Sequence, residues 1–147
     1  VGKGTRWESM FSHASAFNQP LGQWNVGNVT NMRSMFCRAP AFNQPLAQWN
    51  VGSVTTMEGA SAFNQPLGQW NVGKVTNMGS MFAHASAFNQ PLAQWNVGNV
   101  TDMYAMFYDA SRFNQPLEQW NVGKVTNMEY MFDGSGMSSC NKPHWRR

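Results

Sequence analysis

Apolar and polar residues follow a pattern along the chain that predicts two kinds of local structure in turn. In the stretch 17–41, Gln-Trp-Asn-Val alternates polar with apolar positions, so Trp24 and Val26 share one face of an expected short strand. The Val-Thr-x-Met-x-x-Met-Phe segment that follows places apolar side chains at i, i+3 and i+4, as one face of a helix does. These side chains are Met32, Met35 and Phe36. The pattern predicts a strand, a turn, a short helix and a return loop.

This unit repeats along most of the chain. The block Phe-Asn-Gln-Pro-Leu begins at residues 17, 42, 63, 88 and 113, in steps of 25, 21, 25 and 25. A partial unit occupies 7–16, and the 21-residue unit lacks four residues on the side of the expected helix. A fixed period of this size indicates a solenoid, in which each unit buries its apolar face against its neighbours. We expect one solenoid domain over 1–132 and a tail, 133–147, that acts as a cap or a docking segment.

The motif Leu-x-x-Trp-x-Val-x-x-Val-Thr-x-Met-x-x-Met-Phe resembles the 25-residue repeat branch of the BspA-like leucine-rich-repeat surface proteins. The likeness covers about residues 7–132, with Leu21, Trp24 and Val26 in the strand positions of that family. It implies an α/β repeat fold, a right-handed leucine-rich-repeat-like solenoid with one short parallel strand and one short helix in each repeat. It also implies a secreted or cell-surface location and a role in binding or adhesion.

Two rows of amides follow from the expected strands, because Gln and Asn point outward wherever Trp and Val point inward. This candidate binding face consists of Gln23, Asn25, Gln48, Asn50, Gln69, Asn71, Gln94, Asn96, Gln119 and Asn121. Such an array could bind a polysaccharide, another repeat surface or ordered water. Alternatively, stacked amides bond to one another and stabilise the sheet. The opposite orientation, with the tryptophans outside as sugar-stacking platforms, would bury unpaired amides at high cost, so we expect the tryptophans in the core.

A second candidate ladder consists of Thr30, Thr55, Thr76, Thr101 and Thr126. Regular threonine rows can match the spacing of ice, so ice binding is one hypothesis. The other is local, because Thr55 with Glu58, and Thr126 with Glu129, match the capping box at a helix N-terminus. Capping accounts for the ladder without a ligand.

The Phe-Asn-Gln-Pro corner carries a further row of asparagines. Leucine-rich repeats often bury an asparagine ladder that satisfies the backbone of their turns, and we expect that structural role here. The members are Asn18, Asn43, Asn64, Asn89 and Asn114.

The sequence predicts no catalytic site, no metal site and no cofactor. His13 and His84 occupy the same unit position but lie three units apart, roughly 15 Å along the axis, and His144 is in the tail. No cluster of Cys, His or carboxylates has metal-ligand spacing. No nucleophile elbow or phosphate-binding loop occurs.

The distribution of charge, the two cysteines and the two Asn-x-Thr sequons limit the possible partners and covalent modifications. The net charge of +3 is concentrated at the ends of the chain, which does not favour nucleic acid as a partner, and no apolar run is long enough to span a membrane. Cys37 and Cys140 are about four units apart, roughly 20 Å, so they should not pair within a monomer. Asn28 and Asn99 begin Asn-x-Thr sequons, candidate glycosylation sites if the source has a eukaryotic secretory route.

These patterns predict a non-enzymatic repeat scaffold for protein–protein or cell-surface interaction and adhesion, acting through the amide face or an exposed end. Carbohydrate or ice binding on the flat Gln/Asn/Thr face is an alternative, and a structural subunit of a larger assembly is another. The expected partner is a protein or a surface polymer, polysaccharide included, and uncovered ends would allow self-association. An extracellular or cell-surface location is expected.

Overall fold

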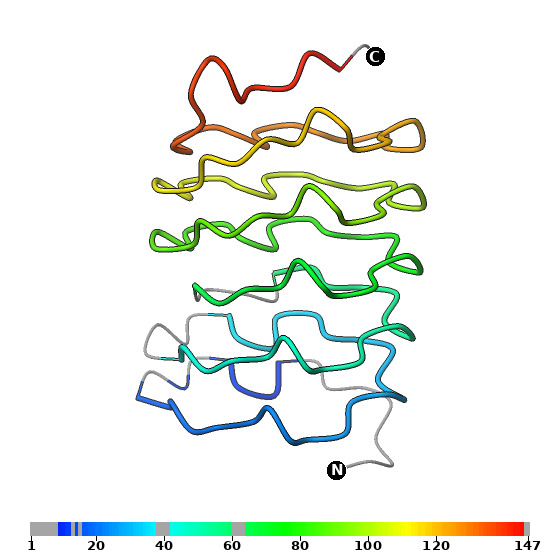
Figure 1. Ribbon diagram of the computed structural model, residues 1–147, viewed down its shortest axis with the longest axis vertical. Helices are drawn as coiled ribbons and strands as arrows, with labels where there is room; N and C mark the ends of the chain where they lie inside the picture. Colours follow the sequence, from blue (N-terminus) through cyan, green and yellow to red (C-terminus); the bar gives the residue numbers. More distant parts are fainter. Residues whose placement is uncertain (1–8, 13, 15, 38–41, 60–63, 146–147) are drawn as a thin grey trace.

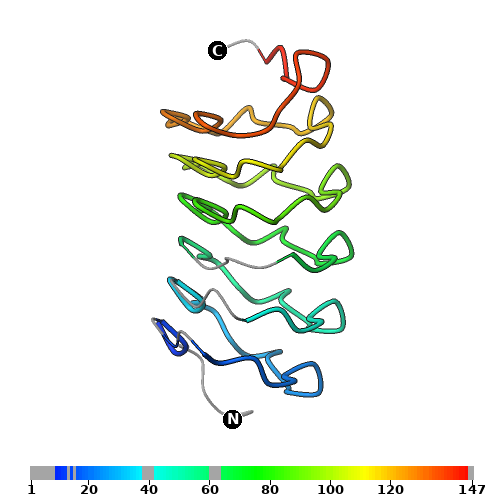
Figure 2. The same cartoon turned by 90° about the vertical axis from the view of Figure 1, so that its left-hand side faces the viewer.

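A computed structural model describes the protein over residues 9–12, 14, 16–37, 42–59 and 64–145. The chain winds in successive coils that stack along the long axis of the molecule, with the C-terminal segment at one end (Figure 1). Each coil turns in a loop at two opposite edges of the stack (Figure 2). We number the coils from their Phe-Asn-Gln-Pro-Leu blocks and call the segment after them the tail. The coils are 17–41, 42–62, 63–87, 88–112 and 113–132, and the tail is 133–145.

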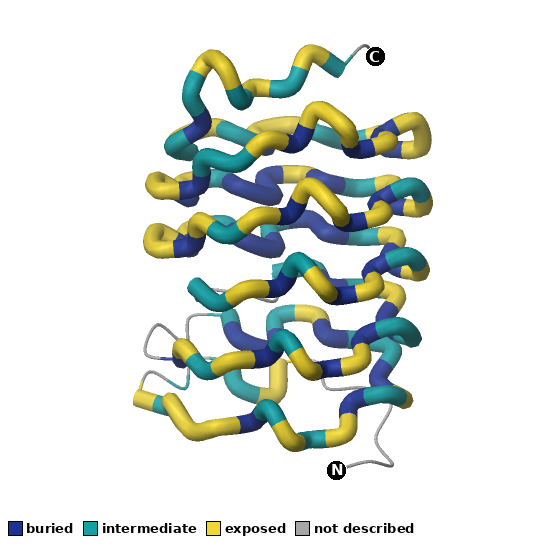
Figure 3. The backbone as a smooth tube through the Cα atoms, viewed as in Figure 1, coloured by how far each residue is buried: buried dark blue, intermediate teal, exposed yellow. Residues whose placement is uncertain are grey.

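The apolar residues of every coil are buried in one core, and buried positions recur from coil to coil (Figure 3). In the second coil, Leu46, Trp49 and Val51 keep only 0%, 4% and 1% of their surface exposed. Trp70, Trp95 and Trp120 are buried in the same way in the coils that follow. The prediction that indoles and valines fill the interior is confirmed, and an outward set of tryptophans is excluded for these coils.

The expected α/β fold class is wrong. The described residues contain no helix, and their strand content is limited to single bridging residues, so the protein is not a leucine-rich-repeat-like solenoid with a strand and a helix in each repeat. The bridges are parallel and join neighbouring coils. They pair Asn31 with Thr56, Thr56 with Asn77, Asn77 with Asp102, and Asp102 with Asn127.

The segment predicted as a strand lies between two turns. The Trp49 N–H donates to the Leu46 carbonyl at 3.0 Å, and the Val54 N–H donates to the Val51 carbonyl at 3.0 Å. Burial still alternates along this segment, since Trp49 and Val51 are buried and Asn50 is exposed. The alternation of polar and apolar residues therefore predicted correctly which side chains face the core. The backbone bridges between coils, however, do not form in this segment but farther along each coil.

The segment predicted as a helix is a series of turns, each containing a residue in the left-handed region. Ser80 has φ of 55°, and the N–H groups of Met81 and Ala83 bond within the coil, to the carbonyls of Met78 and Ser80. The N–H of Ser80 instead reaches the Tyr104 carbonyl of the next coil at 2.7 Å. We call these segments the turn edge. They are 32–37, 57–59, 78–84, 103–109 and 128–134.

The close spacing of the coils explains why the turn edge is not helical. The rings of Phe82 and Phe107, one coil apart, have centroids 5.5 Å apart, whereas a helix with its side chains is about 10–12 Å across. So short a segment also cannot offset the cost of helix nucleation. Turns that include the left-handed residues Ser80 and His84 still bury Met78, Met81 and Phe82 in the core, which is why the spacing of these residues resembles a helix face.

The shortened second coil loses part of the turn edge and keeps its corner. Gly59 has φ of 62° and matches Ser34, with φ of 54°, so the first turn of this edge is retained. The corner is intact, because the Gln65 side chain donates to Asn43 Oδ1 at 3.0 Å.

Candidate functional site

Five glutamines form one row along the outside of the stack, one in each coil. All are exposed, as predicted, and we call them the glutamine row. They are Gln23, Gln48, Gln69, Gln94 and Gln119. Within the part of the chain that the structure describes, none of their side-chain amides makes a hydrogen bond. Each amide therefore retains both its donor N–H groups and its acceptor oxygen for solvent or a ligand.

The asparagine row beside it is also exposed but holds its own backbone. The Oδ1 of Asn71 accepts the N–H of Gly73 at 3.0 Å, forming an Asx turn. A Cβ on Gly73 would lie only 3.1 Å from that oxygen. The same 3.0 Å bond occurs at Asn25, Asn50, Asn96 and Asn121. This row has a structural role, and among the ten predicted residues the glutamines are those whose side-chain oxygens accept no hydrogen bond in the described residues.

A second set of Asx turns lies at the bridging positions, which the sequence analysis did not identify. Each side-chain oxygen accepts the N–H two residues later, at 2.8 to 3.0 Å. The residues are Asn31, Asn77, Asp102 and Asn127. The recurrence of Asn or Asp at this position could have predicted these turns from the sequence, because both residues form Asx turns readily.

The threonine ladder joins neighbouring coils and caps no helix. Each hydroxyl donates to the backbone carbonyl of the threonine one coil earlier, at 3.1 to 3.3 Å, from Thr55, Thr76, Thr101 and Thr126. The capping-box prediction is wrong because no helix follows these threonines in the described residues. Glu58 instead lies 3.6 Å from the Arg33 guanidinium.

The corner asparagines also join the coils. Asn43 Oδ1 accepts the backbone N–H of Asn64 at 3.2 Å and the side-chain N–H of Gln65 at 3.0 Å. The pattern recurs from Asn18, Asn64 and Asn89. The expected structural role is present, but the ladder is not buried: its members are exposed or half-buried.

The tail continues the ladders although its sequence does not repeat the unit. Ser138 N–H and Asn141 Nδ2 both donate to Asn114 Oδ1, at 2.9 and 3.0 Å, in the roles of the missing Asn and Gln. Trp145 lies over Trp120, with ring centroids 6.3 Å apart and planes 8° apart. The tail therefore covers part of the fifth coil, and its role as a cap or a docking segment stays a prediction.

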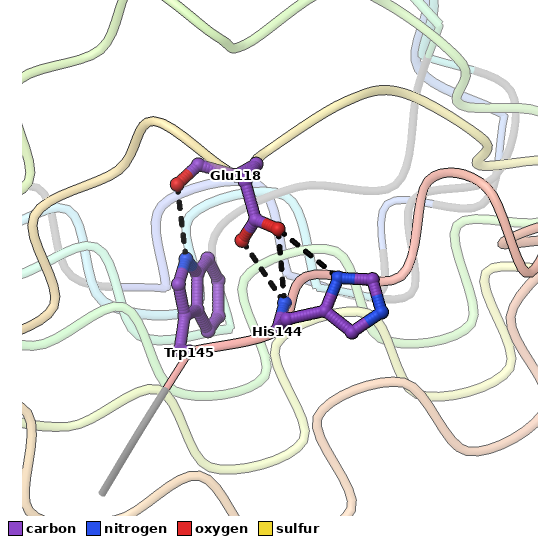
Figure 4. A network of polar contacts seen from close by, with 3 residues as sticks. All are labelled: Glu118, His144 and Trp145. Atoms are coloured by element: carbon purple, nitrogen blue, oxygen red, sulfur yellow. Dashed lines mark hydrogen bonds and ion pairs between the residues drawn. The ribbon is translucent and has the colours of Figure 1, made fainter.

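Glu118 secures the end of the tail (Figure 4). Its carboxylate accepts the backbone N–H of His144 at 2.9 Å and lies 3.1 Å from the His144 ring Nδ1, while its backbone carbonyl accepts the Trp145 indole N–H at 3.4 Å. The backbone hydrogen bond first, and the ring second, hold the pKa of Glu118 below its ordinary value. The other coils carry Gly or Ala at the position of Glu118, so the carboxylate there is the feature of the sequence that sets this coil apart.

The titratable residues form no recognisable catalytic constellation in the described residues. His84 lies 3.4 Å from Asp109, and both side chains are well exposed. His144 belongs to the tail contact, and His13 lies outside the described residues. Among the residues described, no group of three or more His, Cys, Asp or Glu could hold a metal ion, and no helix is long and apolar enough to cross a membrane.

The two cysteines and the two sequons remain separate features. Cys37 and Cys140 are both free thiols, which confirms that they do not pair within the chain. Asn28 and Asn99 are exposed. The Asn99 Nδ2, the nitrogen that would carry a glycan, donates to the Gly73 carbonyl at 2.8 Å. Glycosylation at either position stays a prediction.

Comparison with known proteins identifies one family. The family described as "Mycoplasma protein of unknown function, DUF285" matches residues 1–60 and 56–145. No curated protein and no solved structure matches the chain.

Proposed function

This chain belongs to the DUF285 family, and from the geometry of its glutamine row we propose that it is a non-enzymatic interaction scaffold of a cell surface. The glutamine row is the proposed contact surface, and a protein or a surface polymer is the proposed partner.

The observation that carries the proposal is the contrast between the two amide rows. Asn71 uses its side-chain oxygen on Gly73, whereas Gln69 and Gln94 are exposed and make no side-chain hydrogen bond in the described residues. An uncharged amide both donates and accepts, so the row suits a partner with alternating donors and acceptors. Five positions one coil apart extend over roughly 19 Å if the coils are spaced as paired backbones are.

A polypeptide edge is the favoured partner chemistry, and a polysaccharide could use the same donors and acceptors. Ice binding on the threonine ladder has weaker support, because Thr55 and Thr76 already donate their hydroxyl protons to backbone carbonyls. A structural subunit of a larger assembly remains a further proposal. The tail covers the fifth coil with Trp145, which favours the glutamine row over self-association through that end.

The surface location rests on the likeness of the repeat motif to BspA-like surface proteins. We propose the relationship to BspA-like proteins from the repeat motif alone, because the coils consist of turns and lack the strand and helix that this likeness implies. Antibody labelling of intact cells of the source organism tests the location, with labelling of permeabilised cells only as the contradicting result. The absence of an enzyme activity is proposed because His84, Asp109 and the other described titratable groups form no catalytic constellation.

Binding to intact source cells, to a polysaccharide panel and to a glycan array tests the glutamine row. The variant Q48E/Q69E/Q94E keeps the side-chain shapes but replaces three amides by carboxylates, and we expect at least tenfold weaker binding. A matched control, N28D/K74Q/K124Q, changes the net charge by the same −3 at exposed positions of the Val-Gly-x-Val turns. It should bind as the unaltered chain does.

Equal binding by both variants would contradict the glutamine row as the contact surface. Selective loss on the polysaccharide panel alone would identify a surface polymer as the partner. Thermal hysteresis that disappears in T55V/T76V/T101V would overturn the proposal in favour of ice binding.

A further inference from the structure

The coils differ from one another at several positions along the turn edge. Every coil carries Phe-Asn-Gln-Pro-Leu and Gln-Trp-Asn-Val-Gly without change. The position two residues after the bridging residue of each coil, by contrast, is occupied in turn by Arg33, Glu58, Gly79, Tyr104 and Glu129. A constant surface presents the same groups on every coil, whereas a variable loop edge can distinguish a particular ligand.

Aromatic residues gather on this edge in the last two coils. All three tyrosines of the chain, Tyr104, Tyr108 and Tyr130, lie within 103–109 and 128–134. Tyr104 and Tyr130 are 40% and 54% exposed, and their rings meet edge to face with centroids 5.9 Å apart. Exposed paired tyrosines are typical of contact surfaces, because the ring is apolar and the hydroxyl is polar.

The charge around these tyrosines is negative. Segments 102–111 and 127–136 contain four of the seven carboxylates of the chain and no Lys or Arg, although the whole chain carries +3. The four are Asp102, Asp109, Glu129 and Asp133. Backbone bonds from Ala105 to Glu129 and from Asp109 to Asp133, both 2.8 Å, hold the two segments side by side.

From this placement we propose that the turn edge of the fourth and fifth coils, centred on Tyr104 and Tyr130, docks an arginine- and lysine-rich segment of a partner protein. We call this surface the tyrosine patch, and it includes Glu129 and Asp133. Carboxylates pair with the cationic groups of such a segment, and a guanidinium also stacks on an aromatic face. This surface is separate from the glutamine row and does not depend on it.

Fluorescence anisotropy of the full chain with labelled hexa-arginine, hexa-lysine and hexa-glutamate tests the patch. Hexa-arginine should bind more tightly than hexa-lysine, and hexa-glutamate should not bind. Y104A/Y130A should weaken hexa-arginine binding at least tenfold, whereas Y104F/Y130F should stay within twofold. Ala suits both positions, because Ala105 matches Tyr130 with φ of 51° and Gly79 matches Tyr104.

The charge contribution has its own variants. E129Q/D133N should weaken hexa-arginine binding and reduce its dependence on salt. E58Q, on the turn edge of the second coil, removes one carboxylate away from the patch and should leave binding within twofold. Q48E/Q69E/Q94E should also retain hexa-arginine binding, so failure of the glutamine row and failure of the patch give different results.

Several results would overturn the tyrosine patch. They are absence of hexa-arginine binding, equal binding by Y104A/Y130A and the unaltered chain, and weakening by E58Q as large as that by E129Q/D133N. A homodimer in the unaltered chain that Y104A/Y130A dissociates, with peptide binding unchanged, would identify a second copy as the occupant instead.

Discussion

The indole N–H of Trp95 donates a 2.9 Å hydrogen bond to the backbone carbonyl of Leu67, one coil earlier in the stack. Both residues are buried, so the bond is shielded from water. The same bond runs from Trp49, Trp70 and Trp120 to the leucine of each preceding coil. The tryptophans therefore fill the core and also attach each coil to its neighbour.

Trp95→Phe should lower the free energy of unfolding by about 1–3 kcal/mol, because it leaves the buried Leu67 carbonyl without its donor. Urea unfolding followed by circular dichroism measures the loss. Trp145→Phe is the control: its indole bond is longer, 3.4 Å, and its side chain is half-buried, so the loss should be smaller. Equal losses in the two variants would contradict the role of the buried bond.

Asn71→Ala should lower the free energy of unfolding by about 0.5–1.5 kcal/mol, because the Gly73 N–H loses its acceptor. Asn71→Asp should change the free energy of unfolding little, since a carboxylate oxygen is also an acceptor. Asp102 accepts the Tyr104 N–H in the same way. Thermal and urea unfolding check both variants. An Asp variant as unstable as the Ala variant would show that the Asx turn is not the reason for this row.

Glu118→Gln should loosen the tail at neutral pH. The hydrogen bond from the His144 backbone lowers the pKa of Glu118 in the folded chain. Its contribution is therefore fully present above the pKa of the unfolded carboxyl and is lost as the pH falls through the lowered folded pKa. Hydrogen exchange of the His144 amide should be faster in E118Q at neutral pH, and the difference should vanish in acid.

The control for the contact between Glu118 and His144 is Glu129→Gln, which changes an exposed carboxylate on the turn edge of the fifth coil. It should leave the exchange of the His144 amide unchanged at every pH. The same pH dependence in E118Q and in the unaltered chain would show that another group holds the tail.

Gly134→Ala should lower the free energy of unfolding by about 1–2 kcal/mol. Gly134 has φ of +75°, and an added Cβ would collide with the Asp109 carboxylate and come within 3.3 Å of the Asp109 Cα. Gly68→Ala is the control, because Ala47 and Ala93 occupy the matching position in other coils. Its unfolding free energy should change by less than about 0.5 kcal/mol. Similar losses in both variants would contradict the close approach at Gly134.

Some features of the candidate site were predictable and others were not. The exposure of Gln69 follows from alternation with Trp70, which needs only a period of two. The engagement of Asn71 by Gly73 was readable in principle from Asn-Val-Gly, because Asn two residues before a turn glycine favours an Asx turn. The carboxylate of Glu118 stands out against the Gly and Ala of the other coils, but its partner His144 was not predictable, since the tail no longer repeats the unit.

The repeat and its alternation, by themselves, determined which side chains face the core, because burial follows from periodicity whatever the backbone does. They could not determine the backbone of the Met32–Phe36 segment, whose i, i+3, i+4 spacing serves a helix and a series of turns equally. Only the packed stack decided this: coils with Phe82 and Phe107 centroids 5.5 Å apart leave no space for a helix. At that separation the N–H groups of Ser80, Phe82 and His84 each reach a carbonyl in the next coil, while the N–H groups between them bond within the coil. Left-handed residues such as Ser80 and His84 allow the turns to satisfy both sets of bonds.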